Sequence, residues 1–285
     1  MATLVNKSSE TDNHTVFGDE KGEYNRKTSP NGDKAQSTEV GKPSISLKGV
    51  TVNRGGSIAL DVPELDIFAG YTALVGPNGS GKSTALHVIS GLLRPATGTV
   101  TMAPSISGRV AYVLQSQHAS KHLLVTAREV VQLARRTGRF GWISRADRKV
   151  VDEAMDRLGV RGLANRHLAD MSGGQRQRVL IAQGLAQDTD VLLLDEPVAG
   201  LDIASEQVIR KAISHEKDQG RTVVVATHDL DEAAQADQVV MLNGNVIAAG
   251  RPEEVLTPEV FRQAYRGRVL DLGDGSIAVD DAHHH

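Results

Sequence analysis

The alternation of apolar and polar positions predicts where ordered structure begins in this chain. Residues 1–43 are rich in Ser, Thr, Asn, Asp, Gly and Lys and have almost no apolar periodicity. Such a segment buries too little apolar surface to offset its ordering entropy, so we expect a disordered tail. The alternatives are a regulatory arm and a vector-derived leader. Residues 44–52 then alternate, residues 61–68 form a second apolar run, and Gly55-Gly56 separates the two. This pattern predicts antiparallel strands joined by a turn.

From about residue 116 to residue 184 the apolar spacing is typical of helices. Thr126, Ser144 and Ser172 are N-cap candidates ahead of three such runs, and Glu129 completes a capping box with Thr126. Gly159 is placed to end the second helix. The positions expected to face the core are Val130, Val131, Leu133 and Ala134 in the first helix, Val150, Val151, Ala154, Met155 and Leu158 in the second, and Val179, Leu180, Ala182, Leu185 and Ala186 in the third.

The remaining apolar runs predict a buried sheet. Residues 191–194 are too continuously apolar for a half-exposed strand, and with residues 222–226 we interpret them as buried parallel strands. Asn243-Gly244 between two apolar runs predicts a type I′ hairpin turn. Further elements are expected as strands over 100–102 and 110–114 and as a helix over about 204–218. The sequence thus predicts an α/β core over 44–250 with a helical insertion, followed by a C-terminal extension over 251–285.

Composition and charge set limits on function. The chain has 285 residues, 40% hydrophobic and 24% charged, with a net charge of −3, so any nucleic-acid contact would have to be local. The absence of cysteine excludes disulfides and thiolate metal sites and fits a reducing interior. The sequence has no signal-peptide core and no run of about 18 apolar residues, the length that a membrane helix needs. We therefore expect a soluble intracellular protein that reaches a membrane through a partner.

Residues 76–84 fit the phosphate-loop pattern G-x-x-x-x-G-K-[ST] at every fixed position. An apolar run precedes them and a helix-like segment follows, the context in which glycines turn backbone N–H groups toward an anion. Lys82 is expected to reach the β- and γ-phosphates, and the Ser83 hydroxyl to bind Mg²⁺. The residues expected to bind nucleotide are Gly76, Pro77, Asn78, Gly79, Ser80, Gly81, Lys82, Ser83 and Thr84.

Two further segments carry candidate chemistry. Asp195 and Glu196 follow a buried run; the first is suited to hold Mg²⁺ and the second to orient or deprotonate an attacking water. Two acids after an apolar run are more often an ordinary strand-to-loop junction, but the phosphate loop upstream favours function. The second segment, Ser172, Gly173, Gly174 and Gln175, forms another anion cradle at a helix N-terminus. By itself this segment is equally consistent with a capped helix.

Taken together, these motifs resemble the ATP-binding subunits of ABC transporters. The resemblance covers residues 44–250 and rests on the phosphate loop, Met171-Ser172-Gly173-Gly174-Gln175, Leu194-Asp195-Glu196-Pro197 and Thr227-His228-Asp229 in that order. It implies a P-loop NTPase (RecA-like) core with an antiparallel β subdomain and an inserted α-helical subdomain at about 116–184. It also implies ATP and Mg²⁺ as ligands, and a head-to-tail dimer in which each ATP lies between one phosphate loop and the Ser-Gly-Gly-Gln segment of a second copy.

The resemblance also assigns individual roles. Asp195 would support Mg²⁺ and Glu196 would be the catalytic base, while Gln115 would touch the metal and sense the membrane partner. His228 matches a switch histidine near the γ-phosphate, and Asp202 matches a residue that crosses the dimer interface. The chain departs from the family pattern at two positions. Met171 replaces the usual leucine, and Arg54 replaces an aromatic residue that stacks on adenine. We expect the Arg54 guanidinium to take over that packing, because its plane can also stack on a base.

Local stretches over 123–126, 138–142 and 164–167 resemble the ATPase subunits of zinc and manganese importers. This favours an importer for a divalent transition metal, working at the inner face of the cell membrane with permease subunits and, indirectly, a solute-binding protein. The alternatives are another cargo (an iron–siderophore or cobalamin complex), an exporter, or a non-transport ATPase acting on DNA or ribosomes. The single ATPase unit, the absence of a coiled-coil insertion and the lack of a basic stripe argue against the last.

The histidines offer little independent support for a metal site. His118 and His122 stand four residues apart and could share a metal, but no third ligand is nearby in the sequence. His283, His284 and His285 fit the remains of a purification tag.

Overall fold

The computed structural model of the chain describes residues 42–104, 106, 109–114, 124–136, 143–265, 269–271 and 277–279. Several expectations concern residues outside these ranges. They are the tail before residue 42, Gln115, His118, His122, residues 138–142 and His283 to His285.

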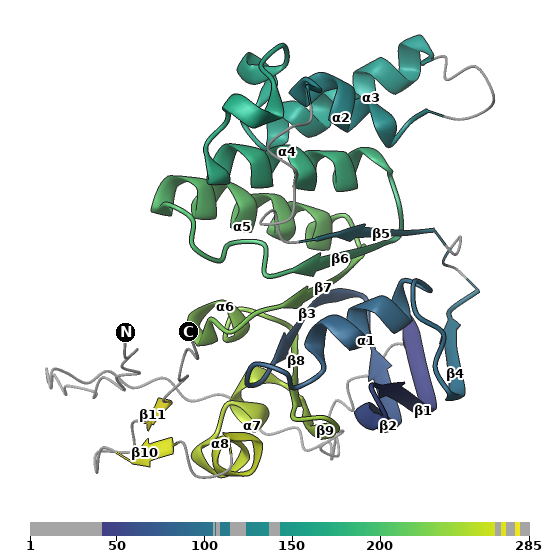
Figure 1. The fold of residues 1–285 in the computed structure, drawn as a ribbon, viewed down its shortest axis with the longest axis vertical. Helices are drawn as coiled ribbons and strands as arrows, with labels where there is room; N and C mark the ends of the chain where they lie inside the picture. Colours follow the sequence, from purple (N-terminus) through teal and green to yellow (C-terminus); the bar gives the residue numbers. More distant parts are fainter. Residues whose placement is uncertain are drawn as a thin grey trace, which may run out of the picture.

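A six-stranded sheet forms the centre of the molecule (Figure 1). Its order is β5 (Val110–Val113), β6 (Val191–Asp195), β7 (Thr222–Ala226), β3 (Gly70–Val75), β8 (Gln238–Leu242) and β9 (Val246–Gly250). The first five strands run parallel, and β9 pairs antiparallel with β8. The expected buried parallel strands over 191–194 and 222–226 are confirmed.

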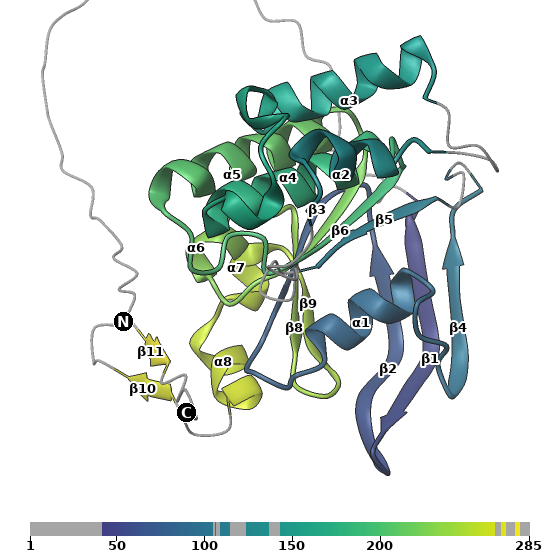
Figure 2. The same cartoon turned by 45° about the horizontal axis from the view of Figure 1, so that its top comes forward.

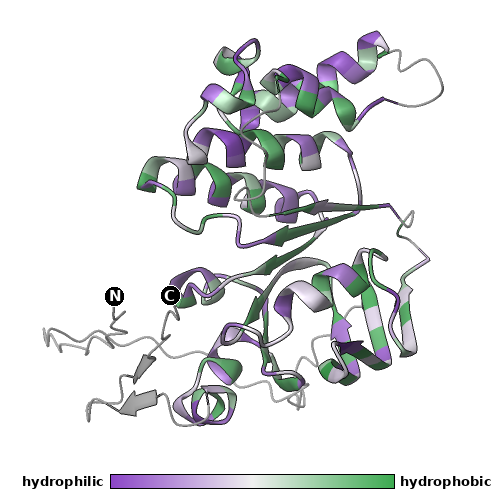
Figure 3. Ribbon diagram, viewed as in Figure 1, coloured by the Kyte–Doolittle hydropathy of each residue, from purple (hydrophilic) through white to green (hydrophobic). Residues whose placement is uncertain are grey.

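Both faces of this sheet are covered, which explains why its strands are apolar along their whole length. In β6, Leu192 and Leu194 pack into one core cluster, and Val191 and Leu193 pack into another on the opposite face. Figure 3 shows the central strands as continuously hydrophobic, whereas β1 and β2 alternate. A strand with two buried faces has no solvated side on which polar residues are favoured.

On one face, a three-stranded antiparallel sheet and one helix complete the core. The sheet has the order β2 (Ser57–Ile67), β1 (Ile45–Arg54) and β4 (Thr97–Met102), as the alternating pattern predicted. Helix α1 (Lys82–Ile89) lies between the two sheets (Figure 2). Its buried Leu86 and Ile89 belong to the same cluster as the inner residues of β1 and β2.

The opposite face carries the helical layers. These comprise α2 (Ala127–Leu133), α3 (Arg145–Arg157), α4 (Gly173–Ala186) and α5 (Ile203–Asp218), with two short 3₁₀ turns, η2 (Arg161–Leu163) and η3 (Leu168–Asp170). Thr126, Ser144 and Ser172 are N-caps, each with a complete capping box, so all three predicted helix starts are confirmed. The fold is therefore the predicted one: an α/β core with an antiparallel β part and an inserted helical part.

One predicted core position is wrong. Leu133, the last residue of α2, is 53% exposed, whereas Val130 and Val131 are buried. Each residue turns a helix by about 100°, so Leu133 points roughly 110° away from the middle of the face that Val130 and Val131 define.

The hairpin between β8 and β9 exists, but its turn is not type I′. A type I′ turn needs positive φ at both central residues. Gly244 has φ 75°, but Asn243 is not among the described non-glycine residues with positive φ. Three residues, 243–245, join Leu242 to its partner Val246. Tertiary bonds hold this longer loop, because the Gly244 N–H donates to the Ser80 carbonyl at 2.8 Å and the Asp61 N–H donates to the Gly244 carbonyl at 2.7 Å.

The chain after β9 returns to the core. Helices α7 (Pro252–Val255) and α8 (Pro258–Tyr265) follow, and Val255, Phe261 and Ala264 are buried in the main cluster. A small hairpin of β10 (Val269–Asp271) and β11 (Ile277–Val279) ends the described chain. Within the described ranges, no helix combines the length and the apolar character needed to cross a membrane.

Candidate active site

The phosphate loop joins the end of β3 to the start of α1 and is held tightly against the β8–β9 turn. Gly76 has φ 147°, and a Cβ atom there would lie 2.1 Å from the carbonyl oxygen of Leu242. Only glycine allows this approach. The Ser80 N–H also donates to the Pro77 carbonyl at 3.0 Å, so the loop is closed on itself.

The N-terminus of α1 is open to an anion. Its N-cap, Gly81, has φ 99° and offers no side chain to the first N–H groups, and the first turn has no acidic residue. Those N–H groups and the helix dipole therefore attract a negative group from outside. The buried Lys82 adds a positive charge: its Nζ donates to the Gly76 carbonyl at 2.7 Å and to the Pro77 carbonyl at 3.2 Å.

An open cavity of about 340 Å³ lies over this loop. It brings together residues that are far apart in the sequence, including Arg54 from the end of β1 and Glu196 from the end of β6. The lining residues are Arg54, Ala59, Asn78, Gly79, Ser80, Gly81, Lys82, Ser83, Thr84 and Glu196. Most of the predicted nucleotide residues therefore share one cavity with the predicted base.

Glu196 has an unusual backbone that aims its side chain. Its φ is 45°, and among the described non-glycine residues only Asp188 shares a positive φ. The Glu196 N–H donates to the Ala226 carbonyl of β7 at 2.9 Å. Its Oε1 lies 3.8 Å from Nδ1 of His228. Strained residues of this kind persist where the surrounding structure holds them, often at functional sites.

The electrostatic surroundings keep Glu196 ionised. A hydrogen bond from His228 and the charges of His228 and Lys82 lower the pKa of Glu196. Partial burial raises this pKa, but the net effect is a lowering. An ionised carboxylate can accept a proton from a water molecule or orient it.

Asp195 contacts a residue that the sequence analysis did not assign to the site. The Tyr112 hydroxyl on β5 donates to Oδ2 of Asp195 at 3.2 Å. Burial, and after it the charge of Asp195, raises the pKa of this hydroxyl. The apolar run over 110–114 indicated a strand but not which neighbour Tyr112 would meet, because that depends on the β5–β6 register.

His228 and the segment after Glu196 line a second cavity of about 200 Å³. Its residues are Glu196, Val198, Ala199, Gly200, Leu201, Glu206, Thr227, His228 and Asp229. Asp202 has a local role here as the N-cap of α5. Its carboxylate accepts from the Ser205 N–H at 2.8 Å and from the Ser205 hydroxyl at 2.9 Å.

The second anion cradle does not meet the first within one chain. Residues 172–175 line neither cavity. The Ser172 hydroxyl accepts from the Gln175 N–H at 3.2 Å, and Gln175 Oε1 accepts from the Ser172 N–H at 3.2 Å. Figure 1 places α4 in the helical layer, across the sheet from α1.

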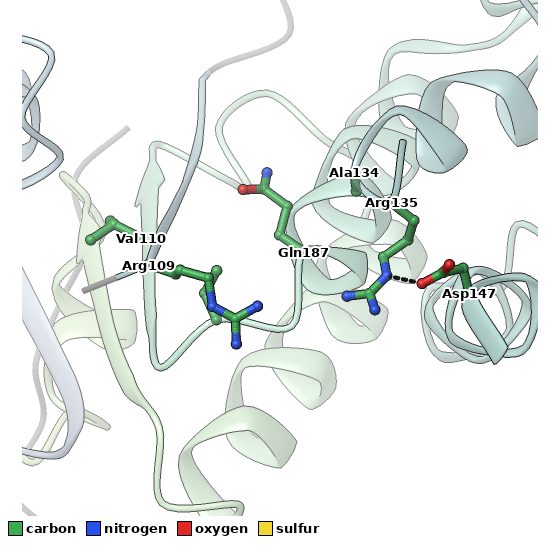
Figure 4. A pocket seen from close by; sticks show the side chains of 7 residues that line it. Arg109, Val110, Ala134, Arg135, Asp147 and Gln187 are labelled. Atoms are coloured by element: carbon green, nitrogen blue, oxygen red, sulfur yellow. Dashed lines mark hydrogen bonds and ion pairs between the residues drawn. The ribbon is translucent and has the colours of Figure 1, made fainter. Parts of the chain in front are cut away.

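A larger cavity, of about 420 Å³, is lined by none of the predicted site residues that the structure describes (Figure 4). It lies between β5 and the helical layer, where Arg109 faces the Arg135–Asp147 ion pair, whose Nε–Oδ1 distance is 2.8 Å. The candidate site is therefore identified by the chemical groups that line its cavity, and not by the size of the cavity.

An ionic cluster supports the turn that carries His228. Asp229 caps α6 (Leu230–Ala233), and Arg210 Nη2 donates to Asp229 Oδ2 at 2.8 Å. Arg210 Nη1 lies 3.8 Å from Oε1 of Glu232, which is only 1% exposed. Burial raises the pKa of Glu232, and Arg210 and the Thr227 hydroxyl offset that effect only in part.

Comparisons with known proteins agree with this site. Residues 60–199 match the family model described as ABC transporter. The chain is 40% identical over 257 residues to the cobalamin import ATP-binding protein BtuD of Halobacterium salinarum, covering 83% of this chain but 63% of that protein. It is 37% identical over 207 residues to the manganese transport system ATP-binding protein MntB of Halalkalibacterium halodurans, covering 69% of this chain and 81% of that protein.

A solved structure of an ATP-binding cassette is also similar. It is dimeric, represents a post-hydrolysis state and is bound to ADP and Pi. Its TM-score is 0.63 at 30% identity, over 73% of this chain and 98% of that one.

We expect Glu232→Gln to stabilise the protein increasingly as pH rises. Because the folded pKa of Glu232 is raised, its contribution to stability is complete below the unfolded pKa of about 4.3 and is lost as pH rises through the folded pKa. A stability difference of about 1 kcal/mol shifts the Tm of a domain of this size by about 2–4 °C. Thermal melts between about pH 4.5 and 7.5 measure the difference in Tm from wild type.

The control for that experiment is Glu253→Gln, which removes a negative charge from an exposed position on α7. A Glu232→Gln difference that stays flat or shrinks with rising pH would contradict the expectation.

Proposed function

The chain belongs to the ABC transporter family of ATP-binding subunits, and on that premise we propose that it hydrolyses ATP to energise transport through a membrane permease. One observation carries the proposal. The open N-terminus of α1, the phosphate loop and the ionised Glu196 line a single cavity. An anion cradle that shares a cavity with an ionised carboxylate is an arrangement suited to phosphoanhydride hydrolysis.

The N–H groups of the phosphate loop would bind the nucleotide, and Lys82 would contact its β- and γ-phosphates.

Ser83 and Asp195 also fit Mg²⁺. Ser83 is exposed in the first turn of α1, and Asp195 ends β6, so a hydroxyl oxygen and a carboxylate oxygen are available. Mg²⁺ prefers such oxygen ligands, together with phosphate oxygens. When bound, Mg²⁺ neutralises negative charge on the phosphates. Gln115, proposed as a further ligand, lies outside the described residues.

In this proposal Glu196 is the base. Its lowered pKa keeps the carboxylate deprotonated, so that it can accept a proton. Nδ1 of His228 lies 3.8 Å from Oε1 of Glu196, and His228 would hold this carboxylate and contact the γ-phosphate. Adenine would pack on Arg54 at the other end of the cavity. Its Nη2 lies 3.3 Å from Nδ1 of His87, which restrains the guanidinium plane.

ABC ATPase cassettes form dimers and work with membrane permeases. We propose the finer arrangement for this chain, a head-to-tail pair in which residues 172–175 of one copy cover the ATP on the phosphate loop of the other. The separation of the two cradles within one chain supports it. Asp202 would lie at this interface beside Ile203, a large apolar side chain that is 75% exposed.

For cargo we propose a divalent transition metal, zinc or manganese, taken up with a solute-binding protein and with this chain at the inner face of the cell membrane. Similarity to a manganese-transport ATP-binding protein over 81% of its length supports the choice. Cobalamin is the second candidate, because a cobalamin-import relative is 40% identical, although this chain spans 63% of its length.

Glu196→Gln tests the catalytic assignment. The variant should retain ATP and accumulate as a dimer, because the amide cannot accept the proton, and turnover should fall by about 10²–10⁴-fold. Phosphate release, retained nucleotide and size-exclusion chromatography measure these effects. Glu64→Gln on β2, an exposed carboxylate 68% accessible, is the matched control. Turnover that persists in Glu196→Gln would refute the assignment.

Arg54→Ala should weaken ATP binding by about tenfold, since a cation–π stack is worth about 0.5–2 kcal/mol. Arg54→Tyr, which restores an aromatic plane, should bind at least as well as wild type. Titration of a fluorescent ATP analogue measures both. Unchanged affinity in Arg54→Ala would rule out adenine packing by this residue.

The cargo is tested in vesicles that contain the chain and its native permease. ATP should drive accumulation of radiolabelled manganese or zinc, and the Glu196→Gln complex should accumulate neither. Accumulation of labelled cobalamin without either metal would favour the second candidate.

A further inference from the structure

We propose that Tyr112 is a positioning residue that fixes the Asp195 carboxylate for Mg²⁺. The inference rests on the proposed function, which assigns Asp195 to the metal. Tyr112 lies on a neighbouring strand, outside the phosphate loop and outside the segment that contains Asp195.

The strand register brings the two side chains together. Tyr112 of β5 pairs with Leu193 of the parallel strand β6. Side chains two residues apart on a strand share a face, so Asp195 stands on the same face as Leu193 and one step further along. The phenol reaches across this diagonal and donates to Oδ2 of Asp195 at 3.2 Å. The bond engages Oδ2, and the carboxylate keeps further lone pairs that could bind a metal.

Helix α1 holds the tyrosine ring in place. The rings of His87 and Tyr112 meet edge to face, with centroids 5.4 Å apart and planes at 88°. Such T-shaped contacts are favourable because a positive ring edge meets a negative ring face. Arg54 Nη2 lies 3.3 Å from Nδ1 of the same His87. Four side chains from β1, α1, β5 and β6 thus form a continuous row from the nucleotide cavity to Asp195.

This row would limit rotation of the Asp195 carboxylate. A carboxylate without such a partner turns about its last side-chain bond, so binding a metal costs the entropy of that motion. Hydrogen bonds to a ligating carboxylate remove the cost in advance, and loss of such partners typically lowers metal affinity by 10–100-fold. A phenol suits the task because its ordinary pKa, near 10, keeps the proton on the oxygen at neutral pH.

A purely structural role makes a different prediction. If the hydroxyl only satisfies a half-buried carboxylate, its removal should change thermal stability and leave metal affinity alone. Metal binding must therefore be measured directly and separately from turnover.

The experiment uses Mn²⁺ as the probe, with the full chain and a nucleotide analogue that is not hydrolysed. Electron paramagnetic resonance counts free and bound Mn²⁺. Tyr112→Phe keeps the ring on His87 and removes only the hydroxyl; we expect Mn²⁺ affinity to fall by about tenfold, with unchanged nucleotide affinity in the absence of metal. Tyr265→Phe, another buried tyrosine on α8, is the matched control and should bind Mn²⁺ as wild type does.

Two further variants separate the possible results. Asp195→Asn should lose Mn²⁺ binding, and if it does not, the metal assignment within the proposed function is wrong. If Asp195→Asn loses Mn²⁺ while Tyr112→Phe binds it as wild type does, only the inference about Tyr112 is overturned. His87→Ala leaves both bonding partners in place and removes the ring that holds Tyr112. It should weaken Mn²⁺ binding to a smaller extent, and an unchanged affinity would remove His87 from the row.

Discussion

The candidate site depends on the parallel direction of β3, β6 and β7. Parallel neighbours end at the same edge of a sheet, so the phosphate loop, Glu196 and His228 emerge side by side although more than a hundred residues separate the first from the others. That edge is rigid because both faces of the sheet are buried. Ligand-binding loops on such a support keep their relative positions without bonds to one another.

Backbone constraints at this edge determine which groups face the cavity. Gly76 passes so close to Leu242 that no side chain fits, which holds the loop against the β8–β9 turn. The positive φ of Glu196 turns its carboxylate toward His228 and the loop. The positive φ of Glu196 is unfavourable in isolation, by about 1–3 kcal/mol, and the surrounding sheet maintains it. The geometry is therefore organised before any ligand arrives.

Two features of the structure bear on how the proposed site would be completed. The second anion cradle, at α4, does not line the cavity over the first, as expected if two copies are needed to enclose one nucleotide. Inside one copy, His87 and Tyr112 link Arg54, which we propose packs on adenine, to Asp195, the proposed metal ligand. A bound nucleotide would then be held both by contacts within one copy and by contacts from the second copy.

Local patterns in the sequence were enough to determine the strands, the phosphate loop and the three capped helices. Caps at Thr126, Ser144 and Ser172 involve residues three positions apart, and the buried runs reflect burial on both faces, so short stretches contain all the information. Tertiary structure alone decided the turn at Asn243-Gly244, which bonds to Ser80 and Asp61 set, and the partners of Tyr112 and Glu232, which strand register and helix packing set. These contacts join residues up to 183 positions apart (Asp61 and Gly244), and no local periodicity records which residues the folded chain brings together.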